Sequence, residues 1–354
     1  MIAVDAMGGD HAPKAPTLGA LQAARRGIAV TLFGDEAKLI PILNGACYSW
    51  KKLPLKIVHC TESISMFDQP SKAVMRKKDS SLLQAVQAVA DGKANAIVSA
   101  GNSGAMLVAG SVVLGRVRGI KRPAIGQFLP TKKGSTFCLD LGANVDCKSN
   151  YLHHFAIMGS VYVQLIKKIE HPKVALLSNG MEPYKGSSVV KEAYALLKKD
   201  STINFVGNLE PHDFFDDHAD VLVSDGFAGN IMLKSIEGTT KVVKHWIDEA
   251  RRSSWVHRIL FLLSLPLLGT IRKKSDYARK GGALLLGVQK PMVLAHGSSN
   301  ARAMRYAIEF AHAAVKKEIV KTFNQKLAQQ MDRHTSGAAR VAQKVKEIFR
   351  SSRS

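Results

Sequence analysis

The sequence has few cysteines, few aromatic residues and no long hydrophobic run. Its four cysteines are scattered and none has Cys-x-x-Cys spacing, which suits a reducing compartment in which the thiols serve as small buried side chains. No apolar run reaches the roughly 18 residues that a membrane-spanning helix needs. Residues 1–5 lack the basic segment of a signal peptide. These absences predict a cytoplasmic protein.

Acidic residues are also scarce, with 28 Asp and Glu against 50 Lys and Arg and a formal net charge of +22. Such a balance predicts an acidic partner, which could be nucleic acid, an anionic membrane or an acidic protein. Aromatic residues make up only 6% of the chain, and they do not alternate with arginine as in nucleic-acid binding surfaces. We therefore expect no nucleic-acid partner.

The common nucleotide and hydrolase motifs are absent. The chain has no Gly-x-Gly-x-x-Gly, no Walker loop and no Gly-x-Ser-x-Gly. The pair His153-His154 has no Cys or Glu at metal-ligand spacing. The sequence thus predicts no metal site and no bound cofactor.

What the chain does contain is an alternation of short β-branched runs, turn residues and helical patterns over most of its 354 residues. Strands that alternate with helices predict an α/β fold with a mainly parallel sheet covered on both faces.

One local pattern occurs twice. Residues 96–107 and 221–233 each contain a β-branched run, then Ser-x-Gly-x-x-Gly, then an apolar helical pattern. A glycine loop between a strand and a helix directs backbone N–H groups and the positive end of a helix dipole at one point. In open α/β sheets that point lies where ligands bind. The repeat predicts an enzyme that handles phosphate.

Other loops that follow predicted strands are also rich in Gly, Asn, Ser and Asp. Turn formation and helix capping explain any one of these loops. Because five such loops follow strands, a shared ligand site is an equally good interpretation.

Residues 251–280 break the pattern. A short apolar run, interrupted by Pro266, is flanked on both sides by basic residues. It is too short to span a bilayer. It fits a buried helical hairpin, as at a dimer interface, a membrane-surface anchor with a cationic rim, or both together. The residues expected to contact a membrane or a carrier protein are Arg251, Arg252, Arg258, Leu263, Leu267, Arg272, Lys273 and Lys274.

The loops together carry a resemblance. Their motifs are Asp5-Ala-Met-Gly-Gly-Asp10-His11-Ala-Pro13, Ala100-Gly-Asn-Ser-Gly104, Leu139-Asp-Leu-Gly-Ala-Asn144, Lys185-Gly186, Ser224-Asp-Gly-Phe-Ala-Gly-Asn230 and Ala295-His-Gly-Ser-Ser-Asn300. In this order, over residues 1 to about 330, the set resembles the bacterial acyl-acyl-carrier-protein:phosphate acyltransferase family of phospholipid synthesis.

The resemblance implies that a fatty acyl group passes from acyl carrier protein to inorganic phosphate, giving acyl phosphate for a membrane glycerol-3-phosphate acyltransferase. It implies a homodimer and a Rossmann-like α/β/α sandwich of the isocitrate/isopropylmalate dehydrogenase type. With the charge, it leads us to expect peripheral association with the inner face of the cell membrane. We expect one domain over residues 1–330, with a short helical apolar protrusion at 251–280, and a basic tail at 331–354.

The resemblance also implies site residues. The family's catalytic lysine and asparagine fall on Lys185, which would neutralise phosphate, and Asn230, which would donate a hydrogen bond. The remaining phosphate- or substrate-binding candidates are Asp5, Gly8, Gly9, Asp10, His11, Gly101, Asn102, Ser103, Gly104, Asn144, Asp225, Gly226, Gly229, His296, Gly297, Ser298, Ser299 and Asn300.

Three other classes of function compete. A short-chain phosphotransacetylase would use coenzyme A and has no reason for an apolar basic protrusion. An NAD-dependent decarboxylating dehydrogenase would need metal-binding aspartates and an arginine cluster that we cannot place. A non-enzymatic anion- or nucleic-acid-binding protein would explain the charge but not the strand-end loops.

Overall fold

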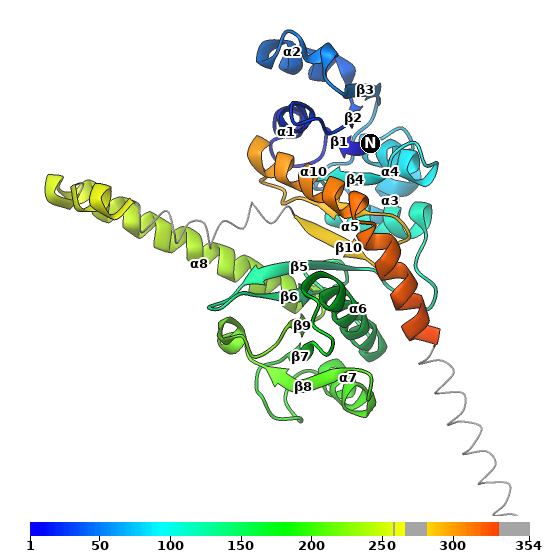
Figure 1. Cartoon of the computed structure of the whole chain (residues 1–354), viewed down its shortest axis with the longest axis vertical. Helices are drawn as coiled ribbons and strands as arrows, with labels where there is room; N and C mark the ends of the chain where they lie inside the picture. Colours follow the sequence, from blue (N-terminus) through cyan, green and yellow to red (C-terminus); the bar gives the residue numbers. More distant parts are fainter. Residues whose placement is uncertain (258, 266–281, 333–354) are drawn as a thin grey trace, which may run out of the picture.

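The structure, a computed structural model, describes residues 1–257, 259–265 and 282–332. A sheet of eleven strands runs through the described part of the chain (Figure 1). The strands are β1 (Ile2–Asp5), β2 (Val30–Gly34), β3 (Leu55–His59), β4 (Ala96–Ser99), β5 (Ala124–Pro130), β6 (Ser135–Leu139), β7 (Lys173–Leu177), β8 (Asn204–Leu209), β9 (Val221–Val223), β10 (Ala283–Leu286) and β11 (Met292–Leu294).

The order of the strands is β3-β2-β1-β4-β11-β10-β5-β6-β9-β7-β8. Neighbours from β3 to β11 are parallel, and so are neighbours from β6 to β8. Between these blocks, β10 is antiparallel to both β11 and β5, and β5 is antiparallel to β6. The predicted α/β fold with a mainly parallel sheet is confirmed, and the antiparallel centre joins two parallel blocks.

Helices cover both faces of the sheet. They are α1 (Lys14–Ala24), α2 (Glu36–Ala46), α3 (Pro70–Arg76), α4 (Ser81–Ala90), α5 (Ser103–Ala109), α6 (Ser149–Lys167), α7 (Ser188–Lys199), α8 (Gly226–Ser253) and α10 (Ala301–Lys316), with short turns at Trp50–Lys52, Gly110–Leu114 and Asp213–Asp216. Helices α1, α2, α6, α7 and α10 pack into one apolar core. Helices α3, α4 and α5 and the first turns of α8 pack into a second core. We call these sides the α6 face and the α8 face.

Local sequence explains where the helices begin. Asn102, Ser187, Asp225 and Asn300 each cap a helix by accepting a hydrogen bond from a backbone N–H of its first turn. Such caps satisfy donors that have no partner inside the helix. Asn102, Asp225 and Asn300 follow strands β4, β9 and β11 by two to six residues, so three of these helices begin close to the carboxyl ends of strands, whereas Ser187 follows β7 by ten residues.

Helix α8 is the longest helix described, at 28 residues, and Figure 1 shows it extending away from the sheet. Beyond it, residues 255–257 and 259–265 are helical and largely exposed. With residues 251–254 at the end of α8, these are the described part of the predicted protrusion, and residues 258 and 266–280 lie outside the described residues.

At the other end of the chain, residues 319–332 are helical, and the predicted tail from residue 333 onward lies outside the described residues. In the ranges that the structure covers, no helix is both long and apolar enough to cross a membrane.

Candidate active site

The loops after β1, β4 and β11 meet at one end of their parallel block. We call residues 5–11, 99–104 and 295–300 the first loop cluster. The backbone N–H of Asp10 donates to the carbonyl of Gly297 at 2.9 Å. A Cβ at Gly8 would lie 2.9 Å from the backbone nitrogen of Gly101. These loops contact one another through backbone, which is why glycine is needed there.

A buried carboxylate organises this cluster. Asp5, at the end of β1, is 3% exposed. It accepts hydrogen bonds from Ser81 Oγ at 2.6 Å, Ser99 Oγ at 2.7 Å and the backbone N–H of Met7 at 3.2 Å. Burial raises the pKa of Asp5, while the hydrogen bonds from Ser81 and Ser99 oppose that rise. Its oxygens are directed at the loops rather than at solvent.

The loops after β6, β7 and β9 form the second loop cluster, residues 140–144, 178–187 and 224–230. The backbone N–H of Gly226 donates to the carbonyl of Asn144 at 2.7 Å. A Cβ at Gly229 would lie only 2.1 Å from the carbonyl oxygen of Asp140. The side chain of Asn230 lies beside Gly142, where an added Cβ would be 3.5 Å from Asn230 Cγ.

Asp140 organises the second cluster as Asp5 organises the first. It is fully buried and accepts from the backbone N–H groups of Ile125, Ala143 and Asn144 and from Asn144 Nδ2, at 2.6 to 3.0 Å. Burial raises the pKa of Asp140 to about 6 against these hydrogen bonds. The repeat therefore extends beyond the glycine loops. In each block a buried aspartate stands at the end of one strand or directly after it, and a buried serine, Ser99 or Ser224, stands in the same way on the neighbouring strand.

Lys185 lies on the β7 loop of the second cluster and is half-buried. Its aliphatic stem lies against Gly180, and its ammonium is 5.9 Å from the centre of the Tyr184 ring. The loop is braced by a hydrogen bond from the N–H of Gly186 to Asn179 Oδ1 at 2.9 Å. No hydrogen bond or ion pair joins the two described residues Lys185 and Asn230, although both belong to the second cluster.

A contact between a histidine and a glutamate connects helix α8 of the second cluster to the first cluster. His296 Nε2, on the loop after β11, lies 3.4 Å from Glu237 Oε2, which is three turns into α8. The Nδ1 atom of His296 accepts from the backbone N–H of Ser298 at 3.2 Å and lies 2.8 Å from Ser298 Oγ. Since Nδ1 is an acceptor, Nε2 carries the proton that faces Glu237. Helix α8 thus starts in the second cluster and reaches the first.

Several predicted binding residues hold the loops together. The amide nitrogen of Asn102 donates to carbonyls of Ser65, Met66 and Asp68. The amide nitrogen of Asn144 donates to Pro123 O and to Asp140. Together with the capping roles of Asn102, Asp225 and Asn300, these contacts mean that many polar side chains support the loops directly.

The remaining predicted residues belong to the same loops or to the arm, by which we mean the outer part of α8 from Val242 onward together with residues 254–257 and 259–265. Asp10, His11, Ser103, Ser298 and Asn300 are exposed, and Ser299 is buried. In the arm, Arg251 pairs with Asp248 at 3.5 Å and its guanidinium lies 5.2 Å from the Phe261 ring centre, while Leu263 is 73% exposed. Arg258, Leu267, Arg272, Lys273 and Lys274 lie outside the described residues.

Asp140, Ser81 and Glu237 were not among the predicted site residues. Asp140 had a usable signal, because it stands directly after a strand, much as Asp5 stands at the end of β1. Ser81 and Glu237 lie in helices without any local signature, so only the fold shows their contacts. Across the described ranges, no three His, Cys, Asp or Glu residues are placed to hold a metal ion.

The comparisons with known proteins agree with this geometry. Residues 1–322 match the family described as fatty acid synthesis protein. A protein named phosphate acyltransferase from Listeria innocua is 44% identical over 91% of this chain and 94% of its own. One of the same name from Geobacter sulfurreducens is 44% identical over 98% of both chains.

Solved structures support the fold. A phosphotransacetylase from Streptococcus pyogenes, 17% identical, superimposes with a TM-score of 0.54 over 89% of this chain and 94% of that one. The EutD phosphotransacetylase from Staphylococcus aureus, 16% identical, gives 0.53 over 89% and 93%. The family resemblance predicted from the loops is confirmed: the chain belongs to the fatty acid synthesis protein family, alongside proteins named phosphate acyltransferase.

Proposed function

We propose that this protein transfers a fatty acyl group from acyl carrier protein to inorganic phosphate. The observation that carries the proposal is the pair of glycine-loop clusters, each built on a buried aspartate and linked by the contact between His296 and Glu237. Family membership supplies the acyl chemistry. Two glycine-loop clusters suit a reaction with two negatively charged groups, the phosphate and the developing oxyanion, because each cluster can stabilise one of them.

The chemistry needs no acyl-enzyme. A phosphate oxygen attacks the thioester carbonyl, the tetrahedral oxyanion collapses, and the carrier thiolate leaves and takes up a proton. The protein must hold phosphate against the carbonyl and stabilise the oxyanion. Lys185 is the cation of the second cluster suited to phosphate. Asn230, in the first turns of α8 and half-buried, can donate its amide N–H to the oxyanion.

We propose a second copy of this chain as the partner of α8. The outer part of α8 exposes Val242, Val243, Trp246 and Ile247 by 42 to 61%. These positions repeat at helical spacing, so they form one apolar stripe. A stripe on an extended helix is stabilised when a second helix covers it, which favours a homodimer built on this arm.

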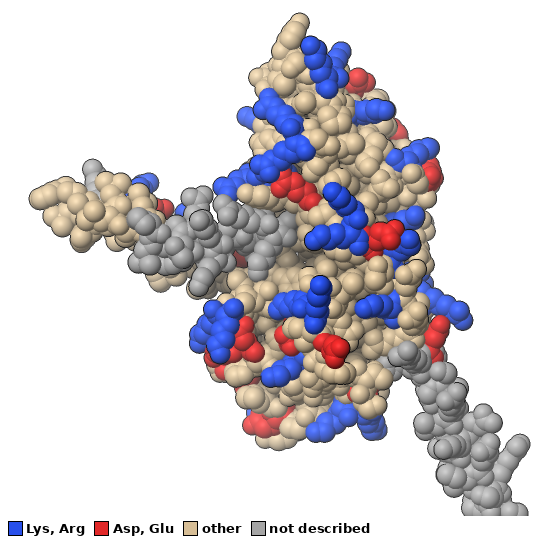
Figure 2. All heavy atoms as spheres, in the orientation of Figure 1, with Lys and Arg blue, Asp and Glu red and all other residues tan. Residues whose placement is uncertain are grey.

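The end of the arm suits the surface of an anionic membrane. Trp255, Leu260, Leu262 and Leu263 are 56 to 73% exposed. Figure 2 shows the described end of the arm as mainly uncharged, while Lys and Arg are spread over the visible face of the body. We propose that the arm touches the cytoplasmic leaflet, where the product would reach a membrane glycerol-3-phosphate acyltransferase. The same basic surface would accept the acidic carrier protein.

We propose that the two parallel blocks of this α/β fold correspond to those of isocitrate-type dehydrogenases, as the resemblance implies. The competing short-chain phosphotransacetylase activity is favoured by the structural likeness alone, and the exposed apolar arm argues against it.

One assay tests the function. Purified protein is mixed with phosphate and either hexadecanoyl-carrier protein or acetyl-coenzyme A, and acyl phosphate and free thiol are measured together. We expect stoichiometric product and thiol with the carrier thioester only. Product from acetyl-coenzyme A alone would favour the phosphotransacetylase, and no product from either donor would contradict both.

A further inference from the structure

A small surface unit borders the first loop cluster. It consists of a turn and helix α3. Lys77, directly after α3, donates to the carbonyl of Ser63 at 2.9 Å and to Asp68 Oδ2 at 2.6 Å. These two bonds fold the turn back against the end of the helix, so that turn and helix form one unit. We call residues 65–78 the α3 platform.

The α3 platform is attached to two loops of the first cluster. On the loop after β4, the amide nitrogen of Asn102 lies 3.1 to 3.4 Å from three carbonyl oxygens of the turn. On the same loop, a Cβ at Gly104 would lie 2.6 Å from Pro70 Cγ. On the loop after β11, a Cβ at Gly297 would lie 3.6 Å from Met66 Cε. The platform therefore has a fixed position beside these loops.

The platform presents apolar side chains to solvent. Phe67, in the turn, is 99% exposed, Met75 is 70% exposed and Met66 is 44% exposed. Hydrogen bonds hold the turn that carries Phe67, because its N–H donates to Ser65 Oγ at 3.2 Å and the N–H of Ser65 donates to Asp68 Oδ2 at 2.8 Å. An aromatic side chain presented in this way is typical of the anchor residues of protein interfaces.

The exposed face of α3 is basic. Ala73 and Val74 are buried. Lys72, Met75 and Arg76 are exposed, and their spacing places them on one face of the helix. Among the residues that the structure describes, neither Lys72 nor Arg76 takes part in an ion pair. Two cations therefore flank an exposed apolar side chain on this face.

The acidic side chains of this region are engaged within the protein. Asp68 pairs with Lys77 at 2.6 Å. Asp79 Oδ2 accepts from the N–H and the hydroxyl of Thr61 at 2.8 and 2.5 Å. Glu62 Oε2 accepts from the N–H of Asp79 at 3.1 Å. The charge that the platform presents to a partner is therefore positive, which favours an acidic partner.

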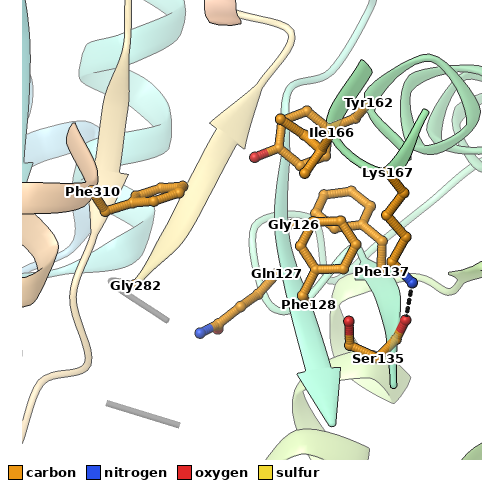
Figure 3. A pocket seen from close by; sticks show the side chains of 10 residues that line it. All are labelled: Gly126, Gln127, Phe128, Ser135, Phe137, Tyr162, Ile166, Lys167, Gly282 and Phe310. Carbon is orange, nitrogen blue, oxygen red and sulfur yellow. Dashed lines mark hydrogen bonds between the residues drawn. The ribbon is translucent and has the colours of Figure 1, made fainter. Parts of the chain in front are cut away.

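The platform is separate from the apolar cavity of about 300 Å³ that the described part of the chain also contains (Figure 3). Phe137, Tyr162 and Phe310 line that cavity, and the first two belong to the core of the α6 face. Ala73 and Val74 of α3 belong to the core of the α8 face. None of the residues that line the cavity belongs to either loop cluster, whereas the platform contacts the first cluster directly.

We propose that the α3 platform is the docking surface for the acidic protein that carries the acyl thioester, with Phe67 as its apolar anchor. The proposal rests on the proposed function for the identity of this partner. The donor must bring its thioester to the loop clusters, so the carrier has to bind next to them. The platform offers apolar area and positive charge at that place. An anionic membrane is also attracted by positive charge, and a separate measurement distinguishes it.

The kinetic test compares two donors with the same thioester. Octanoyl-carrier protein contains the acidic protein, and octanoyl-pantetheine lacks it. Phe67→Ser should raise KM for octanoyl-carrier protein by about tenfold with kcat unchanged, because burial of an aromatic ring favours association by about that factor or more. The same variant should leave octanoyl-pantetheine unaffected. Equal effects on both donors, or no effect on the carrier donor, would overturn the proposal.

The matched control for Phe67→Ser is Tyr48→Ser. Tyr48 is another aromatic residue, 96% exposed, and it lies outside the platform. Its replacement removes a similar exposed ring and should leave KM for octanoyl-carrier protein unchanged. If Tyr48→Ser raises this KM as much as Phe67→Ser does, the platform is not the docking surface.

Charge reversal tests the basic face of α3. Lys72→Glu combined with Arg76→Glu should raise KM for octanoyl-carrier protein by about tenfold at low salt. The effect should nearly vanish in about 1 M salt, where the screening length is about 3 Å. The control combines Lys52→Glu with Lys56→Glu, which reverses two exposed charges outside the platform. Equal effects of the two pairs would indicate general charge attraction and contradict docking at the platform.

A binding measurement separates this proposal from the proposed function. Fluorescently labelled carrier protein without an acyl group is titrated with wild type, Phe67→Ser and Tyr48→Ser in the absence of phosphate. Weaker binding by Phe67→Ser alone supports the platform even if no acyl phosphate is formed, in which case the proposed function alone fails. Equal binding by all three proteins, or no binding by wild type, refutes the platform. Normal carrier binding by Phe67→Ser together with lost co-sedimentation with anionic vesicles would assign the surface to a membrane instead.

Discussion

The contact between Gly229 and Asp140 allows a sharp test of the second loop cluster. In Gly229→Ala the new methyl carbon would start 2.1 Å from the Asp140 carbonyl oxygen and 2.5 Å from Ser224 Oγ. Ordinary contact begins near 3.4 Å, so the start of α8 must move by about an ångström from the β6 loop. Overpacking of this kind typically costs about 1–3 kcal/mol of unfolding free energy. Because Asn230 moves with the helix, turnover should fall by about a hundredfold.

The control lies on the same helix. An added Cβ at Gly238 would have no atom within 4 Å. The free energy of unfolding of Gly238→Ala should therefore rise by roughly 1 kcal/mol, because alanine stabilises a helix by about that amount relative to glycine. Urea unfolding followed by circular dichroism should separate the variants by about 2–4 kcal/mol, and the acyl phosphate assay should separate them in rate. If Gly229→Ala is as stable and active as Gly238→Ala, the packing of α8 on Asp140 does not position the site.

Three further predictions concern single side chains. Lys185→Ala and Asn230→Ala should each reduce turnover by about 10²–10³ with an unchanged melting curve, and near-normal kinetics would remove that residue from the mechanism. Limited alkylation at pH 8, followed by peptide mass spectrometry, should label Cys47 before Cys147. Hydrogen bonds from Arg25 and Ser49 lower the pKa of Cys47, whereas burial raises the pKa of Cys147 to about 12. Labelling in the reverse order would contradict this prediction. Leu263→Glu should weaken co-sedimentation with anionic liposomes while sparing turnover on soluble donor, and loss of the dimer instead would identify the arm as an interface only.

The sequence predicted a mainly parallel sheet because its strands alternate with helices along the chain, but it did not predict that the parallel strands form two blocks. It could not predict the centre of the sheet. Strand β10 returns to β5 from more than 150 residues away, and that pairing leaves no local periodicity in either segment.

For the candidate site, the loops could be predicted from the sequence, but it could not be predicted which of their polar side chains brace the loops and which are available to a ligand. Glycines at 8, 226 and 229 mark close backbone approach, and the structure shows the atoms they approach. Asn102 and Asn144 have the composition of ligand-binding residues, yet their amide nitrogens donate to nearby oxygens of the protein. Composition is the same for both roles, because a side chain that binds a ligand and one that braces a loop need the same polar atoms.

An aspartate at the base of each loop cluster would repel a bound phosphate unless its carboxylate oxygens were engaged in hydrogen bonds within the loops. Asp5 accepts from two hydroxyls and one N–H, and Asp140 accepts from four N–H donors, so their oxygens are engaged within the loops. Burial raises the pKa of both carboxyls, and a bound phosphate would raise it further. The carboxylates therefore shape the loops, and under the proposed function the helix starts and Lys185 would supply the positive potential for phosphate. This explains why glycine spacing, rather than local charge, marks the site in the sequence.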